Sequence, residues 1–175
     1  MKTSHYLLVI LTLFLLVACL NSDPNLDNKG KDELKSLEID REIDETTMLY
    51  SDTVYVPIYS DIYIDQHTQK CLLAATLSIR NTSYTDSLFI SKIDYFDTDG
   101  NLVRSFLKNS ISLPPMATIN YVIEKEDDTG GGGANFIVAL YAKAKIMNPI
   151  IQAIMIGENG NKGFGFTTEG QSINK

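Results

Sequence analysis

Apolar residues divide the chain into three parts. Tyr6 to Ala18 form one apolar run of 13 residues, broken only by Thr12. Residues 20 to about 50 are polar and rich in charge, and from Thr53 onward short β-branched and aromatic runs alternate with turn residues. Such alternation is typical of half-buried β-strands. The pattern predicts an apolar leader, a polar linker and a single β-rich domain.

The most regular strand pattern lies between Cys71 and Arg80, where Leu73, Ala75, Leu77 and Ile79 share one face. Cys71 has the parity of this face, so we expect a buried and inert thiol. An Asp99-Gly100 pair within residues 97–101 predicts a hairpin between neighbouring strands. Further strand patterns cover residues 54–56, 62–64, 88–96, 102–107, 117–124, 135–144, 150–156 and 164–168. No stretch after residue 50 has convincing helical periodicity. We therefore predict an all-β fold, an immunoglobulin-like antiparallel β-sandwich of about eight strands.

The leader has the features of a lipoprotein signal peptide. A membrane-spanning helix needs roughly 20 apolar residues, whereas 13 is the length of a signal h-region. The run ends in Leu16-Val17-Ala18-Cys19, which matches the lipobox, and the Cys19 thiol is the atom that accepts the diacylglycerol. The alternative is an ordinary secretory signal followed by a chance cysteine, but the polar residues that follow favour lipidation.

These features predict a domain order and a location. Residues 1–18 are the signal peptide, residues 19–50 the lipidated N-terminus and acidic tether, and residues 51–170 the β-sandwich domain. A flexible tether of this length spans roughly 30 Å. We expect a lipid-anchored protein of the bacterial cell envelope. Leu20, which is not an aspartate, favours the outer membrane in a Gram-negative host.

Composition excludes several classes of function. The full chain has a net charge of −7, and the loss of Lys2 with the leader leaves −8. An acidic surface repels phosphate, so nucleic-acid binding is not expected. His67 is the sole histidine after the leader and lies in a polar stretch, which indicates a solvated turn and rules out a histidine-rich zinc site. With Cys19 lipidated, Cys71 has no intramolecular disulfide partner.

Two acidic segments raise the question of metal binding. In residues 97–101, glycine follows Asp97 at position four, whereas an EF-hand loop has glycine at position six and glutamate at position twelve. A hairpin turn explains these residues better.

The aromatic residues of the strands, among them Tyr55, Tyr59, Tyr63, Phe89, Tyr95 and Phe96, are better explained by packing than by a sugar-stacking platform.

Residues 124–135 are the most unusual segment, with four acids before Gly130 to Gly133. They lack the Gly-Lys-Ser/Thr ending and the following helix of a P-loop. Asp127 and Asp128 are candidates to hold a divalent cation. The alternative is a mobile connecting loop that needs positive φ at several glycines. The sequence leaves both interpretations open.

Five segments resemble a bacterial family of putative lipoproteins, domain-of-unknown-function family 3124: residues 54–60 (VYVPIYS), 75–81 (ATLSIRN), 94–100 (DYFDTDG), 131–138 (GGGANFIV) and 153–157 (AIMIG). The resemblance implies a secreted, often lipid-anchored domain of unassigned activity, and it supplies no catalytic residues. Several members of that family carry histidines near the positions of Asp61 and Asp65. This departure argues against a metal role for that segment.

Taken together, the residues predict a non-catalytic binding or structural module, without a cofactor, that meets the membrane through its lipid and has a possible partner among envelope proteins. No catalytic constellation is visible. The competing hypothesis is a periplasmic or surface enzyme, or a metal-dependent ligand-binding protein, that uses the acidic glycine-rich loop 124–135.

Overall fold

The structure is a computed structural model of the chain, and it describes residues 35–39, 43–66, 70–145 and 147–173. The chain divides into two compact units, residues 1–36 and 37–175. The predicted signal peptide 1–18, Cys19 and His67 lie outside the described residues. Within the described ranges, no helix has the length and apolar character needed to cross a bilayer.

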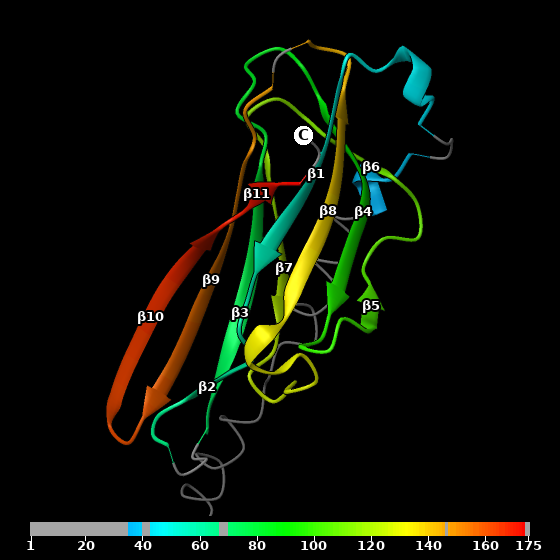
Figure 1. Ribbon diagram of the computed structural model, residues 1–175. Coiled ribbons are helices and arrows are strands. Elements are labelled where there is room, and N and C mark those ends of the chain that lie inside the picture. The colour runs from blue at the N-terminus through cyan, green and yellow to red at the C-terminus, as the bar shows by residue number, and fades with distance from the viewer. Residues whose placement is uncertain (1–34, 40–42, 67–69, 146, 174–175) are drawn as a thin grey trace, which may run out of the picture. The chain divides into compact units, whose positions relative to one another are not determined.

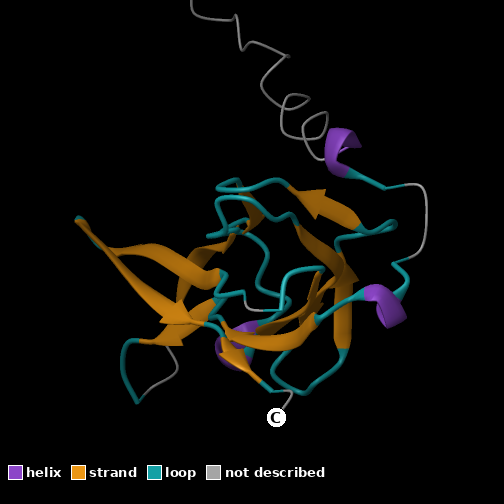
Figure 2. Cartoon of the chain, turned by 90° about the horizontal axis from the view of Figure 1, so that it is seen from above, coloured by secondary structure: helices purple, strands orange, loops and turns teal. Residues whose placement is uncertain are grey.

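The second unit consists of two antiparallel sheets (Figure 1), which confirms the predicted all-β sandwich. Helix is restricted to short turns (Figure 2), including the 3-10 turns η1 (Glu45–Thr47) and η2 (Gly131–Gly133). The strands of the described residues are β1 (Tyr50–Pro57), β2 (Asp61–Tyr63), β3 (Lys70–Arg80), β4 (Leu88–Phe96), β5 (Leu102–Ser105), β6 (Ile111–Leu113), β7 (Thr118–Ile123), β8 (Asn135–Ala142), β9 (Ile150–Asn159), β10 (Lys162–Glu169) and β11 (Gln171–Ser172).

The first sheet has the order β11-β1-β8-β4-β5, with β6 also paired to β4. The second has the order β10-β9-β3-β2, with β7 also paired to β3. The immunoglobulin-like detail of the prediction is not confirmed. In that fold the first strand lies beside the second and the last beside the one before it. Here the first strand, β1, pairs with β8, and the last strand, β11, pairs with β1.

The core lies between the two sheets and is built from alternating residues, as the pattern predicts. Cys71, Leu73, Ala75, Leu77 and Ile79 of β3 are all buried. In the other sheet, Phe136, Val138, Leu140 and Ala142 of β8 are fully or almost fully buried at alternate positions. Each fully buried aliphatic or aromatic side chain of this kind stabilises the fold by about 1.5–3 kcal/mol.

β4 departs from simple alternation because it contains a bulge. Its register against β8 shifts between Ile90 and Lys92, so Ser91 is the additional residue. As a result Ile90 and Ile93 are both fully buried although they are three residues apart. The bulge keeps Tyr95 pointed into the core near the end of the strand.

The predicted hairpin at residues 97–101 is confirmed, since β4 and β5 pair on either side of it. Asp97 Oδ1 accepts hydrogen bonds from the backbone N–H groups of Asp99 (2.9 Å) and Asn101 (2.8 Å). Gly100 has φ of 82°, a conformation that glycine adopts without strain. The hydrogen bonds from Asn101, and further bonds within the turn, lower the pKa of Asp97.

Part of the segment assigned to the tether contacts the domain. Glu38 forms a bridge with Ile111 of β6, and the Ile39 N–H donates to Ser110 O at 2.9 Å. The Tyr141 hydroxyl donates to Glu45 Oε1 at 2.8 Å. Glu38, Ile39 and Glu45 thus pack on the domain, and the compact unit begins at residue 37.

Candidate functional site

The candidate site lies where three segments distant in sequence meet at one end of the sandwich. They are β2 with the residue before it, the β4–β5 turn, and the glycine-rich loop that contains η2 (Figure 1). The Ser60 N–H donates to Gly131 O (3.0 Å), and the Thr98 N–H donates to Gly130 O (2.9 Å). The loop therefore serves as a bridge between β2 and the turn.

These segments surround a cleft of about 520 Å³, a volume within the usual range of small-molecule sites. We call it the Asp61 cleft. Its lining combines aromatic, charged and glycine residues: Tyr59, Asp61, Ile62, Tyr63, Lys70, Thr98, Asp99, Gly131, Gly132 and Gly133. An adjoining cavity of about 260 Å³ shares several of these residues and adds Leu72, Asp97, Asp128, Thr129 and Gly130.

Asp61 is the central polar residue of the cleft. Its residue surface is only 2% exposed, and its Oδ2 atom accepts a hydrogen bond from Lys70 Nζ at 2.9 Å. Its other oxygen, Oδ1, is buried and has no hydrogen-bond partner among the described residues. A buried carboxylate oxygen that lacks a partner costs free energy. Few such groups persist in native proteins, and each calls for an explanation such as a bound water, ion or ligand.

Lys70 lines both the cleft and the adjoining cavity. Its side chain is 43% exposed, and its ammonium group also lies 5.3 Å from the centre of the Tyr63 ring. The hydrogen bond to Asp61 raises the pKa of Lys70, against the smaller opposing effect of desolvation, and the charges of Asp61 and Asp128 add to the increase. Lys70 therefore carries its positive charge into the cleft.

The glycine-rich loop is built for close approach. A Cβ atom on Gly130 would overlap the Tyr95 hydroxyl, and one on Gly131 would lie 2.7 Å from Thr98 Oγ1, whereas one on Gly132 would make an ordinary contact with Asp61. Of the four consecutive glycines, only Gly131 has a positive φ, at 70°. The expectation that several glycines need positive φ is therefore wrong. Most of them are required because neighbouring side chains leave no room for a Cβ.

Tyr95 forms the floor beneath this loop. It is fully buried, and its hydroxyl lies 2.8 Å from the hydroxyl of Ser60. Burial raises the pKa of Tyr95, although hydrogen bonds with Ser60 and Thr129 act in the opposite direction. The packing interpretation fits Tyr95, whereas Tyr63 is 65% exposed at the cleft and packs on Lys70.

The two acids selected from the loop have different surroundings. Asp127 is paired with Arg104, whose Nη2 lies 2.9 Å from Asp127 Oδ2. Burial acts to raise the pKa of Asp127, but hydrogen bonds from Thr129 and the charge of Arg104 outweigh it, and the pKa is lowered. Asp128 lines the adjoining cavity together with Asp61. The structure thus separates the roles of the two residues.

The other residues considered in the sequence are Asp94, Asp97, Asp99 and Cys71. Asp94 accepts a hydrogen bond from the Ser105 hydroxyl at 2.7 Å, and Asp97 stabilises the hairpin turn. Asp99 lines the cleft. Cys71 is buried as predicted, and its thiol donates to Glu158 O at 3.1 Å. Within the described ranges, no group of three or more His, Cys, Asp or Glu side chains is arranged to hold a metal ion.

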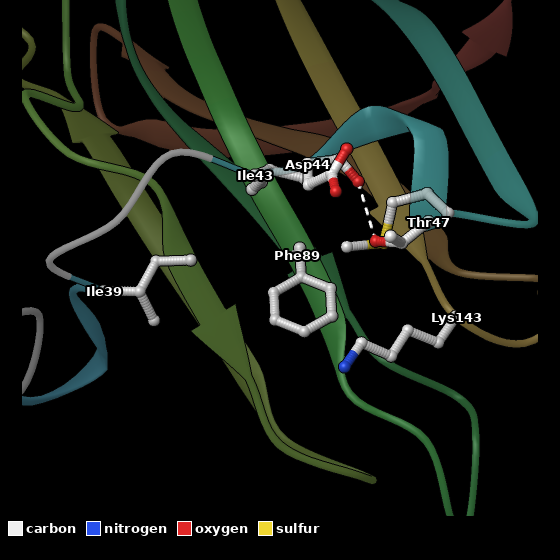
Figure 3. Close-up of a pocket in the computed structure, with 7 residues that line it drawn as sticks. Ile39, Ile43, Asp44, Thr47, Phe89 and Lys143 are labelled. Carbon is white, nitrogen blue, oxygen red and sulfur yellow. Dashed lines mark hydrogen bonds between the residues drawn. The ribbon is translucent and has the colours of Figure 1, made fainter.

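A second cavity of about 250 Å³ lies on the first sheet, where the N-terminal segment passes over β4 (Figure 3). Ile39, Ile43, Asp44, Thr47 and Met48 of that segment line it together with Phe89 and Lys143. The Thr47 hydroxyl donates to Asp44 O at 2.8 Å, which closes the η1 turn at its edge. Among the described residues of this lining, no buried side-chain polar atom lacks a hydrogen-bond partner, so it indicates a ligand less clearly than the Asp61 cleft does.

Comparison with known proteins gives one family. Residues 51–173 match the family model described as "Protein of unknown function (DUF3124)", and the chain belongs to this family. The resemblance seen in the sequence is thereby confirmed. No curated protein matches the sequence. A crystal structure of Thermotoga maritima 1070 aligns at 14% identity, covering 69% of this chain and 92% of that chain with a TM-score of 0.39, a level that supports no conclusion.

Sequence reasoning did not select the central residue of the site. Asp61 stands out in the sequence only as a departure from the histidines of relatives. Its burial depends on the glycine-rich loop, which lies about 70 residues further along the chain. Among the five segments that carry the family resemblance, residues 54–60, 94–100 and 131–138 meet at this end of the sandwich.

Proposed function

We propose that this protein is a lipid-anchored, non-catalytic binding module of the bacterial cell envelope and that its ligand occupies the Asp61 cleft. The observation that supports the binding role is the buried Asp61 Oδ1, which lacks a hydrogen-bond partner among the described residues in a side chain that lines an open cleft. A ligand that donates a hydrogen bond to this atom would remove the cost of leaving it unpaired.

The cleft lining favours binding over catalysis. Among the described residues, the side chains that line it do not include serine, cysteine or histidine. The Thr98 hydroxyl, which lines the cleft, donates to Gly130 O (2.9 Å) and accepts from the Gly133 N–H (3.0 Å), so it holds the loop in place. Nucleophilic catalysis needs an unprotonated nucleophile next to a base. The Lys70 amine lies beside the Asp61 carboxylate, but the hydrogen bond between them raises the pKa of Lys70 and keeps the amine protonated.

The anchor rests on Leu16-Val17-Ala18-Cys19 and on the short apolar run before it. Radiolabelled palmitate supplied to cells that express the full chain tests it. We expect label in the wild-type protein and none in Cys19→Ala. Absence of label in the wild type, or label that survives the substitution, would contradict the anchor without affecting the cleft.

The binding role is tested on the purified full mature chain in detergent by NMR with a panel of small polar fragments. We expect binders to shift the backbone amides of Thr98, Gly131 and Gly132, and to lose this effect in Asp61→Asn. Binders that cluster elsewhere, for example around Phe89 and Lys143, would contradict the assignment of the cleft.

A metal-dependent ligand binder or enzyme that uses loop 124–135 is the competing hypothesis, and the pairing of Asp127 with Arg104 speaks against it. Calcium titration with measurement of the melting temperature separates the two. A site filled at 100 times its Kd stabilises the folded state by about 2.7 kcal/mol. A rise in melting temperature that corresponds to this free energy, and that disappears in Asp127→Asn, would favour the metal-dependent function.

A further inference from the structure

The cleft already contains an ammonium-binding arrangement, and the protein's own Lys70 occupies it. The Lys70 Nζ atom lies 2.9 Å from Asp61 Oδ2 and 5.3 Å from the centre of the Tyr63 ring. A carboxylate on one side and an aromatic face on the other are the two groups that stabilise a primary ammonium ion.

The backbone fixes this arrangement. Tyr63 pairs directly with Lys70 across the β2–β3 ladder, and Asp61 pairs with Leu72. Side chains of directly paired residues, and of residues two apart on one strand, share a face of the sheet. Asp61, Tyr63 and Lys70 therefore lie on the same face, with the carboxylate and the ring held by β2 and the ammonium at the end of a flexible chain.

The charge around this point favours cations. The described residues that line the cleft and the adjoining cavity include four aspartates, Asp61, Asp97, Asp99 and Asp128, and Lys70 is the one basic residue among them. Such an excess of negative charge attracts a cationic ligand and disfavours an anionic one. A divalent metal is less suited, because no metal-binding group is formed by the described residues.

We propose that the Asp61 cleft binds a small ligand bearing a primary ammonium group, which takes the place of the Lys70 ammonium between Asp61 and Tyr63. This inference rests on the proposed function, since it names the ligand class of the same cleft. The exchange keeps the buried carboxylate paired with a cation throughout. The Lys70 side chain is 43% exposed and moves into water. The ligand ammonium has the same three donors as Lys70 but is not attached to β3, so it lies between the two carboxylate oxygens and gives Asp61 Oδ1 its missing hydrogen bond.

The experiment uses the full mature chain in detergent and two probes of equal length, 1,5-diaminopentane and 1,5-pentanediol. Binding is followed by NMR at the amides of Thr98, Gly131 and Gly132. We expect the diamine to bind at the cleft and the diol to bind at least about tenfold more weakly, since a hydrogen bond to a charged group contributes about that factor. Nα-acetyl-lysine amide, as a third probe, distinguishes a free amine from the side chain of a peptide lysine.

Two substitutions change the site in opposite directions. Asp61→Asn keeps the shape but removes the charge, and we expect it to abolish diamine binding. Lys70→Met removes the resident ammonium, and we expect it to tighten diamine binding about tenfold. Lys125→Met is the matched control, because Lys125 forms an exposed pair with Glu158 (2.6 Å) and does not line the cleft.

The outcomes separate this inference from the proposed function. If the diol binds the cleft as well as the diamine, or if Lys70→Met does not tighten binding of the diamine, the ammonium assignment is wrong and the binding role stands. If neither the diamine nor any polar fragment shifts the cleft amides in the wild type or in folded Lys70→Met, both are wrong. Thermal unfolding of each variant shows that loss of binding is not loss of the fold.

Discussion

The hydroxyl groups of Ser60 and Tyr95 lie 2.8 Å apart in the interior and join the residue before β2 to the end of β4. The two residues are 35 positions apart in the sequence. Gly130 closes over this pair from a third segment, and a Cβ atom there would overlap the Tyr95 hydroxyl. Tyr95 therefore packs directly against the glycine-rich loop at Gly130.

Gly130→Ala is expected to destabilise the protein by about 1–3 kcal/mol, because the added methyl group overpacks the space above Tyr95. Urea denaturation of the mature chain measures the change. Gly163→Ala is the control, since a Cβ there has no neighbour nearer than 3.9 Å. Equal effects of the two substitutions would contradict the close approach of Gly130 to Tyr95.

Removal of a tyrosine hydroxyl is expected to have opposite consequences at two buried positions. Tyr95→Phe leaves the Ser60 hydroxyl without its partner and is expected to cost about 1 kcal/mol. The Tyr121 hydroxyl is buried and has no hydrogen-bond partner in the described part of the chain, so Tyr121→Phe is expected to be neutral or stabilising. Chemical denaturation of both variants checks this, and a larger loss in Tyr121→Phe would refute the assignment.

Alkaline pH is expected to destabilise the fold through two tyrosines. Burial, and then the charge of Glu38, raises the pKa of Tyr121 to about 12, and burial with the charge of Asp52 raises the pKa of Tyr50 to about 12. The unfolded chain releases these protons near pH 10. Their contribution to stability is therefore present below pH 10 and is lost as the pH rises from 10 to 12.

Unfolding free energies measured between pH 9 and pH 12 test this dependence. Tyr121→Phe should show a shallower decline than the wild type, and Tyr84→Phe, at an 84% exposed position, is the control. A decline unchanged in Tyr121→Phe would show that Tyr121 ionises alike in the folded and unfolded states.

Arg104→Gln is expected to raise the pKa of Asp127 toward its usual value. In the wild type, hydrogen bonds from Thr129 and the charge of Arg104 outweigh burial and lower this pKa. A lowered pKa contributes stability above the unfolded-state value, and that contribution is lost as the pH falls through the folded-state value. Because Arg104 is 48% exposed, the loss at neutral pH should not exceed about 1 kcal/mol.

NMR titration of the Asp127 side-chain carboxyl measures the shift directly. Arg104→Lys keeps the charge but not the fork of donors, so it should restore part of the lowered pKa. An Asp127 that titrates identically in wild type and Arg104→Gln would contradict the pair.

The Cys71 thiol is expected to be inert toward Ellman's reagent in the folded protein and to react fully in denaturant. Its surface is 5% exposed and its hydrogen donates to Glu158 O. The Cys19→Ala chain makes Cys71 the one thiol that follows the leader. Fast reaction of the native protein would show that the C-terminal end of β9, which contains Glu158, separates readily from Cys71.

Much of the fold could be predicted because strand alternation is local. Cys71 to Ile79 point alternately in and out by the geometry of the strand itself, and the Asp-Gly turn at residues 97–101 forms from its own side chains. Two strands were missed. β6 and β11 have three and two residues, too few to show a period, and they exist because β4 and β1 offer them an edge.

The candidate site was less predictable, because it depends on contacts between distant segments. Asp127 and Asp128 looked alike in the sequence, yet Arg104 engages one and the other lines a cavity with Asp61. The glycine run suggested that several φ angles are positive, whereas Gly130, Gly131 and Gly133 leave space for the close approach of Tyr95 and Thr98. Neither difference could be read from spacing.

The sequence by itself determined the β-sandwich class, the family, the burial of Cys71 and the hairpin at Asp99-Gly100, since each depends on the period or the chemistry of a short segment. The tertiary structure alone decided that Asp61 is buried beside Lys70 and Tyr63 under a loop from residues 130–133. That decision required two sheets to pack, because only packing brings the β2–β3 ladder, the β4–β5 turn and the glycine-rich loop to one end of the domain, where a carboxylate can be removed from water.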